Sequence, residues 1–114
     1  MVDQRAGERL SAAFHALSDP SRRSIIELLR NADELRVTDI AGTFTMSLNA
    51  VSKHLKVLEA SGLVRRRIEG RAHWFKVDWA GLQQPYEWLH FYHHLWSGRL
   101  DALADYVQGE KNDE

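Results

Sequence analysis

Small, polar and basic side chains recur at helical spacing between residues 48 and 61. Asn49, Ser52, Lys53 and Lys56 stand at positions i, i+3, i+4 and i+7, which places them on one side of a helix. Side chains of these types suit a helix that lies in the major groove of DNA. The spacing therefore predicts a DNA-contacting helix, and the alternative for each side chain taken alone is a solvated surface residue.

The segment after this helix is rich in arginine. Residues 63–68 and 72–77 are short β-prone runs on either side of a glycine-containing turn, and such a pattern predicts a hairpin. We expect Arg67 and Arg71 at its tip. Alternate residues of a strand face opposite ways, so the neighbouring arginines could face either DNA or solvent. These neighbours are Arg65 and Arg66.

Charge is distributed unevenly along the chain. The net charge is -1, a value that taken alone argues against a nucleic-acid binder. Residues 47–76, however, hold seven basic residues and two acids, whereas residues 78–114 hold seven acids and two basic residues. The middle segment therefore carries a local charge of about +5 and the tail about -5, and it is the local field that attracts a polyanion.

Five helices and one hairpin can be expected between polar ends. The predicted helices span residues 8–17, 20–31, 37–44, 48–61 and 79–107. Residues 1–7 and the acidic residues 108–114 are expected to be flexible. A short helix, a turn, a helix with a basic face and a hairpin together predict one mainly α domain over residues 8–107, a winged helix-turn-helix.

Local signals indicate where these helices begin and end. Asp19 is a suitable N-cap, and Pro20 suits the first helical position because its missing N–H costs nothing there. Thr38 is a plausible cap for the third helix, and Gly62 suits the position just after the fourth. We expect Pro85 to begin the long last helix.

Apolar residues at helical spacing predict the core. We expect one buried face on the first three long helices, formed by Leu10, Phe14, Leu17, Ile25, Ile26, Leu28, Leu29, Leu48, Val51, Leu55 and Leu58. Arg22 and Arg23 stand in the first turn of the second helix, where the helix dipole disfavours a cation. They are therefore expected to pair within the chain, to be solvated, or to meet a phosphate.

The last helix is too apolar for a lone surface helix. Its large apolar residues cover more than one face, so we expect packing within the domain and against a second copy of the chain. The aromatic residues could equally line a pocket for an apolar ligand. The apolar set is Trp88, Leu89, Phe91, Tyr92, Leu95, Trp96, Leu100, Leu103, Tyr106 and Val107.

The sequence gives little support to functions other than DNA binding. The sequence has no phosphate-binding loop or nucleophile elbow, and helical geometry would point Ser52 and His54 about 200° apart, so no enzyme and no cofactor are expected. A winged helix that binds only protein remains an alternative, although the basic stripe argues against it. The absence of cysteine, of a secretory signal and of a membrane-spanning apolar run predicts a cytoplasmic protein without a membrane partner.

Four segments, in this order, resemble one family of bacterial repressors. They are ALSDPSRR at 16–23, VSKHLKVL at 51–58, SGLV at 61–64 and EGR at 69–71, and they are similar to segments of the ArsR/SmtB family. The resemblance covers residues 10–107. It implies a homodimer, formed through the first and last helices, that binds a palindromic operator in double-stranded DNA.

Carried over to this chain, the resemblance assigns residues to DNA and to the dimer interface. Asn49, Ser52 and Lys53 would read base edges, because asparagine suits adenine and lysine suits guanine. The DNA-contacting set is Ser47, Asn49, Ala50, Ser52, Lys53, His54, Lys56, Arg67 and Arg71, with His54 and Lys56 on phosphate and the two arginines on the wing. The dimer-interface set is Leu10, Phe14, Leu89, Tyr92, Trp96, Leu100 and Leu103.

Many members of the family sense metals, but their metal sites lack a match in this sequence. The segment that holds cysteines in one site has arginine and threonine here. His90 and His93 have the spacing of one ligand pair of another site, with His94 beside them, whereas its second pair falls at Val77 and Trp79, which cannot ligate zinc. We therefore predict no metal site. A zinc-responsive repressor that uses these histidines stays an alternative, and any small-molecule inducer is unidentified.

Overall fold

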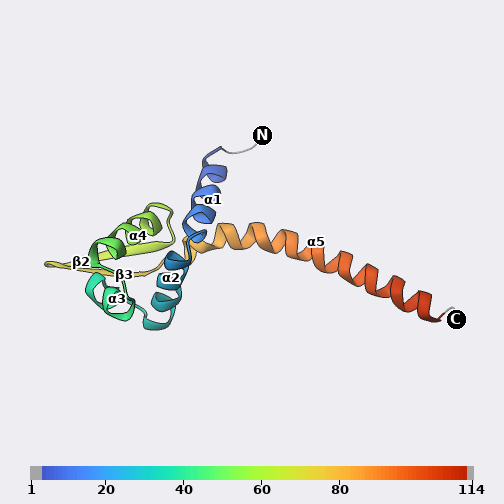
Figure 1. The fold of residues 1–114 in the computed structure, drawn as a ribbon. Coiled ribbons are helices and arrows are strands. Elements are labelled where there is room, and N and C mark those ends of the chain that lie inside the picture. Colours follow the sequence, from blue (N-terminus) through green and yellow to red (C-terminus); the bar gives the residue numbers. More distant parts are fainter. Residues whose placement is uncertain (1–3, 113–114) are drawn as a thin grey trace. The chain divides into compact units, whose positions relative to one another are not determined.

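A computed structural model describes residues 4–112, which contain five α-helices and a three-stranded antiparallel sheet (Figure 1). The elements are α1 (Gln4–Leu17), α2 (Pro20–Ala32), β1 (Leu35–Arg36), α3 (Val37–Thr43), α4 (Leu48–Ala60), β2 (Val64–Glu69), β3 (Ala72–Val77) and α5 (Trp79–Asn112). The mainly helical winged helix-turn-helix predicted from the sequence is confirmed. The chain divides into two compact units between Gln84 and Pro85, and each unit is described separately.

The core of the first unit is formed by every element from α1 to β3 except β1. Its buried side chains are Ala13, Ala16, Ile25, Leu29, Ile40, Val51, Leu55, Leu58, Leu63, Val64, Phe75 and Val77. Three of the four positions predicted to be buried on α4 are in this core. Leu48 is not, because it is the first residue of α4 and its side chain is 53% exposed. On α1 the small residues Ala13 and Ala16 are buried, and Leu10, Phe14 and Leu17 are only half-buried.

The sheet has the strand order β1-β3-β2. The two-residue strand β1 was not expected from the sequence. It pairs with the middle of β3, where Leu35 lies opposite Phe75 and Arg36 lies opposite Trp74. The predicted hairpin is present as β2 and β3, and its register pairs Arg66 with Phe75 and Arg67 with Trp74.

Most of the predicted helix ends are confirmed. The Asp19 carboxylate accepts a hydrogen bond of 3.0 Å from the Arg22 N–H, and this bond is the main reason that the pKa of Asp19 lies below its usual value. Gly62 has φ +80°, and the N–H of Leu63 donates to the carbonyl of Leu58, so α4 ends in a Schellman motif.

Two predicted boundaries were wrong. Arg36, not Thr38, caps α3, and its N–H donates to the Asp39 carboxylate at 3.0 Å. α5 begins at Trp79 and continues through Pro85, because Asp78 already caps it through a 3.3 Å hydrogen bond from the Gly81 N–H.

The two outer helices are also longer than predicted, since α1 begins at Gln4 and α5 reaches Asn112. The first turn of α1 is held by Gln84, whose Nε2 donates to the carbonyl of Ala6 at 2.7 Å. Residues 1–3 and 113–114 of the predicted flexible ends lie outside the described residues. No helix within residues 4–112 is long and apolar enough to cross a membrane.

The arginines at the start of α2 are paired within the chain. Arg22 donates to the carbonyls of Ala16 and His15, and Arg23 donates to the carbonyl of Leu17. These carbonyls belong to the last turn of α1, where they lack partners within the helix. The arginine pair therefore caps α1 and fixes the corner between the first two helices.

α5 begins in close contact with the end of α4. The Asp78 N–H donates to the carbonyl of Leu63 at 2.9 Å, and a Cβ atom added to Gly81 would overlap the carbonyl oxygen of Gly62. Glycine is therefore required at position 81 by the close approach of two backbones.

Gly81→Ala should lower the free energy of unfolding by at least about 3 kcal/mol, because a backbone carbonyl must move to admit the methyl group. Urea denaturation measures this loss. Gly7→Ala, in open space on α1, is the matched control and should be neutral or stabilising by up to about 1 kcal/mol. Equal stability of the two variants would show that the close contact is not present.

Candidate nucleic-acid interface

α3 and α4 form the helix-turn-helix of the first unit. The turn between them ends at Ser47, the N-cap of α4, whose hydroxyl accepts a 3.1 Å hydrogen bond from the Ala50 N–H. Burial of Val51, Leu55 and Leu58 directs one face of α4 into the core. The opposite face is therefore turned outward.

The outward face of α4 carries most of the stripe predicted from the sequence. Asn49, Lys53 and Lys56 are exposed, and Ala50 and Ser52 beside them are half-buried. Within residues 4–112 neither lysine takes part in an ion pair or hydrogen bond.

His54 differs from the other predicted contact residues of α4. Its Nδ1 lies 4.0 Å from the Asp19 carboxylate, and its side chain is only 23% exposed. The structure therefore directs His54 toward the start of α2, away from the lysine stripe.

All three consecutive arginines of β2 are paired with carboxylates of the same chain. Arg65 lies 3.8 Å from Asp78, Arg66 lies 3.0 Å from Glu59, and Arg67 lies 2.8 Å from Glu34 and 2.7 Å from Glu69. Because each cation has an acid beside it, these arginines add much less to the local positive field than the sequence suggested.

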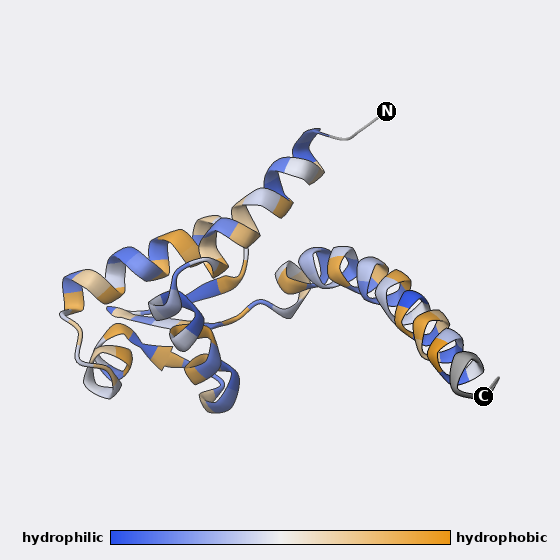
Figure 2. Cartoon of the chain, turned by 45° about the vertical axis from the view of Figure 1, so that its right-hand side comes forward, coloured by the Kyte–Doolittle hydropathy of each residue, from blue (hydrophilic) through white to orange (hydrophobic). Residues whose placement is uncertain are grey.

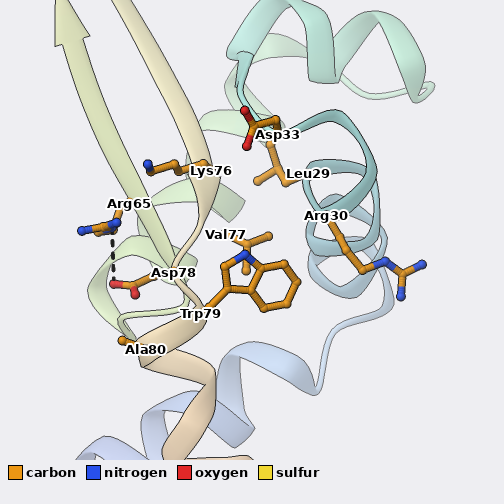
Figure 3. A pocket seen from close by; sticks show the side chains of 9 residues that line it. All are labelled: Leu29, Arg30, Asp33, Arg65, Lys76, Val77, Asp78, Trp79 and Ala80. Atoms are coloured by element: carbon orange, nitrogen blue, oxygen red, sulfur yellow. Dashed lines mark ion pairs between the residues drawn. The ribbon is translucent and has the colours of Figure 1, made fainter.

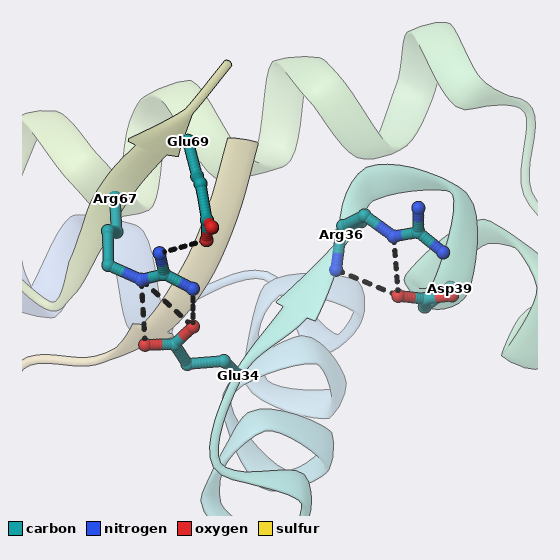
Figure 4. A network of polar contacts seen from close by, with 5 residues as sticks. All are labelled: Glu34, Arg36, Asp39, Arg67 and Glu69. Atoms are coloured by element: carbon teal, nitrogen blue, oxygen red, sulfur yellow. Dashed lines mark hydrogen bonds and ion pairs between the residues drawn. The ribbon is translucent and has the colours of Figure 1, made fainter. Parts of the chain in front are cut away.

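Arg67 is the arginine of β2 that pairs with two carboxylates (Figure 4). Its Nε and one terminal nitrogen donate to Glu34, and the other terminal nitrogen donates to Glu69. Its guanidinium also lies 5.7 Å from the centre of the Trp74 ring, and Arg36 lies 5.3 Å from the same ring. The hydrogen bonds from Arg67 hold the pKa of Glu34 below its usual value, and those carboxylates raise the pKa of Arg67.

Arg71 stands at the tip of the wing. Gly70 has φ +60° in the turn between β2 and β3, and the tip projects beyond α3 and α4 in Figure 1. Arg71 is exposed and, among the described residues, forms no ion pair. It lines a shallow hollow with Arg36 and Thr38 from the start of α3. The wing therefore presents one uncompensated cation at its tip, because Arg67 is engaged further down the strand.

A second hollow, of about 280 Å³, lies at the base of the wing (Figure 3). The Trp79 indole lies beside Val77 and Leu29, and the Arg65–Asp78 pair forms another edge. Three cations and two carboxylates line this hollow together, so it presents no surface of a single sign for a phosphate backbone.

The sequence did not indicate the acids that pair with the wing arginines. Glu34 and Arg67 are 33 residues apart, and Glu34 stands just before a strand that was itself unpredicted. No pattern of spacing links these two positions. Only Arg67 and Glu69 carried a local signal for an ion pair, because they are two residues apart, at the end of a predicted strand and the start of the predicted turn.

The second unit consists of α5 from Pro85 onward. Its large apolar side chains are exposed along the helix, including Leu89, Tyr92, Trp96, Leu100 and Leu103 of the predicted dimer interface. Figure 2 shows hydrophobic residues recurring along the length of this helix. An apolar groove on the helix surface is lined by Leu89, Tyr92, His93, Leu95, Trp96 and Arg99.

The histidines of α5 are arranged along its surface. The ring centres of His90 and His94 are 6.3 Å apart, and His90 stacks on Tyr86 at 5.5 Å. No three histidine, aspartate or glutamate side chains within the described part of the chain are placed to hold one metal ion. Neither histidine therefore belongs to a formed metal site in the single chain.

Known proteins show both the sequence pattern and the fold. A family described as "Helix-turn-helix domain" matches residues 17–67. The Transcriptional repressor SdpR of Bacillus subtilis is 30% identical over 80 residues, which cover 70% of this chain and 88% of SdpR.

Two solved structures resemble the chain over most of its length. The crystal structure of the ArsR family transcriptional regulator RHA00566 is 31% identical with a TM-score of 0.71, over 80% of this chain and 93% of that one. The homodimeric winged helix-turn-helix DNA-binding domain of Mb0332 from Mycobacterium bovis is 25% identical with a TM-score of 0.64, over 83% and 91%. With its helix-turn-helix, its wing and these relatives, the chain belongs to the ArsR/SmtB family of DNA-binding transcriptional regulators, which are not enzymes.

Proposed function

We propose that this regulator is a homodimeric repressor that binds a palindromic operator through α4 and the tip of the wing. The proposal depends on one observation: some basic residues of this region are paired with acids, and others are not. Lys53, Lys56 and Arg71 are exposed and unpaired within the described residues, whereas the β2 arginines are bound to carboxylates. The uncompensated charges coincide with the helix and the tip that a winged helix directs toward DNA.

In this proposal α4 lies in the major groove. Asn49, Ser52 and Lys53 contact base edges near the start of the helix, with Ser47 and Ala50 beside them, and Lys56 contacts a phosphate. Arg71 reaches the backbone or the minor groove from the wing. His54 and Arg67 leave the contact set that the sequence suggested, because each is turned toward a carboxylate of its own chain.

Dimerisation would involve α1 and α5. Leu10 and Phe14 are half-buried on α1, and the apolar residues of α5 are exposed to an extent that favours a protein partner. The homodimeric state of Mb0332 supports a second copy as that partner. A two-fold dimer would place its two recognition helices about 34 Å apart, one turn of DNA.

Repression without a metal is the mode of action that we propose. SdpR is a repressor by name, and a dimer bound over a promoter would exclude polymerase. The chain has no cysteine, and zinc needs three or four ligands. A zinc response through His90, His93 and His94, and a winged helix that binds only protein, are the alternatives that the following experiment separates.

Fluorescence anisotropy with duplex DNA from upstream of the protein's own gene tests the function. We expect tight binding in EDTA, and we expect added zinc to leave the affinity unchanged. The affinity should fall steeply with salt, because the lysines and arginines of the protein release counterions from the DNA phosphates. Abolition of binding by zinc would favour the histidine sensor. If the protein binds this DNA and random DNA equally weakly, the result would favour the alternative of a winged helix that binds only protein.

Lys53→Ala should weaken operator binding by about 1–3 kcal/mol and relax the preference at one base pair. Lys56→Ala is the matched control on the same helix and should weaken binding to all sequences about equally, because it contacts phosphate. Anisotropy with single-base operator variants measures both effects. A Lys53→Ala protein that keeps the affinity and base preferences of the wild type would refute the recognition-helix assignment.

Leu103→Glu should dissociate the dimer, because it places a carboxylate within the apolar surface of α5. His94→Glu is the control, since nine residues turn a helix by about 900° and position 94 therefore faces the opposite side. Analytical ultracentrifugation measures the mass of each variant. A Leu103→Glu protein that still sediments as a dimer would contradict an interface at this position.

A further inference from the structure

We propose that Glu34 and Glu69 act as specificity-determining residues by holding Arg67 away from phosphate. In this proposal, which rests on the proposed function, the wing meets DNA through Arg71 alone. The two carboxylates keep a second wing arginine from becoming a phosphate contact that is independent of sequence.

The first support is the number of contacts that occupy the Arg67 guanidinium. Nitrogens at three positions donate to carboxylate oxygens at distances between 2.7 and 3.3 Å. The guanidinium carbon also lies over the Trp74 ring, 5.7 Å from its centre. A phosphate would have to displace these carboxylates or accept only the two remaining N–H groups.

The second support is the backbone that presents Glu34. Asp33, the preceding residue, has φ +70° and ψ -75°, and the Glu34 N–H donates to the carbonyl of Ala32 at 3.0 Å. This is the γ-turn with positive φ, which is rare and strained for a residue other than glycine. The turn directs Glu34 toward the sheet, where its side chain is 24% exposed and reaches Arg67 two strands away.

The third support is that compensation extends along the whole of β2. Arg65 and Arg66 also have their own acids, Asp78 and Glu59. Exposed ion pairs of this kind contribute little to stability, so stability alone gives a weak reason for them. The ion pairs matter more for DNA binding than for stability. Each one neutralises an arginine that could otherwise contact a phosphate, and phosphate contacts supply most of the affinity for random DNA.

The experiment compares the salt dependence of binding to operator and to random duplex for five proteins. These are the wild type, Arg67→Gln, Arg71→Gln, the double variant Glu34→Gln/Glu69→Gln, and that double variant with Arg67→Gln added. Each phosphate contact contributes about 0.9 to the slope of log affinity against log salt. Glu27→Gln, which removes an exposed acid of α2 that forms no ion pair within residues 4–112, controls for the general change in charge.

We expect Arg71→Gln to reduce the slope by about 0.9 and Arg67→Gln to leave it unchanged. The double glutamine variant should raise the slope by about 0.9 and tighten binding to random DNA more than binding to the operator. Adding Arg67→Gln should cancel this gain. Thermal unfolding of each variant establishes that the effects are measured on folded protein.

Three results would overturn this proposal while the proposed function stands. The first is a reduced slope for Arg67→Gln, which would mean that Arg67 already contacts phosphate. The second is an unchanged slope for the double variant. The third is an increase in slope that remains after Arg67→Gln is added to the double variant, or that Glu27→Gln also produces. In either case the increase would come from the change in net charge and not from Arg67. Loss of DNA binding by the wild type would instead overturn the proposed function itself, and this proposal with it.

Discussion

The fold depends on the burial of one face of α4. Val51, Leu55 and Leu58 are almost completely removed from solvent, and α4 contacts α1, α2, α3 and β2 around them. Because a helix is rigid, burial of one face fixes the direction of the other. The lysine-bearing stripe faces outward for this reason, and a polar substitution in the apolar stripe would disturb both the core and the orientation of the lysine-bearing face.

Both ends of α4 are fixed by interactions that also position its neighbours. The Ser47 hydroxyl closes the helix-turn-helix turn. At the other end, Gly62 redirects the chain into β2, and its carbonyl lies against Gly81 at the start of α5. The wing, α4 and the beginning of α5 therefore share a single corner of the backbone, in which two glycines are required for separate steric reasons.

The positive charge of the folded chain is not one continuous basic patch, because some of its cations are paired with acids and others are not. Counted along the sequence, residues 47–76 carry an excess of positive charge. In the folded chain Asp78, Glu59, Glu34 and Glu69 lie against the β2 arginines, and Asp78 and Glu34 come from outside that segment. Lys53 and Lys56 on α4 and Arg71 at the wing tip stay exposed and form no ion pair within residues 4–112, so the positive charge that the sequence spreads along the whole segment is compensated along β2 and left uncompensated at these positions.

The sequence by itself determined the order of the elements, the Asp19 cap, the Gly62 termination, most of the α4 core and the outward lysine stripe. These features depend on residues within one or two helical turns of each other, so local spacing is sufficient to predict them. The exposure of Leu48 and the cap of α3 are local features that the sequence pattern predicted wrongly. Tertiary structure alone decided the position of β1 and the partners of His54 and Arg67. Each of these depends on which distant segment lies alongside, and contacts such as the one between Glu34 and Arg67, 33 residues apart, leave no periodic signal in the chain.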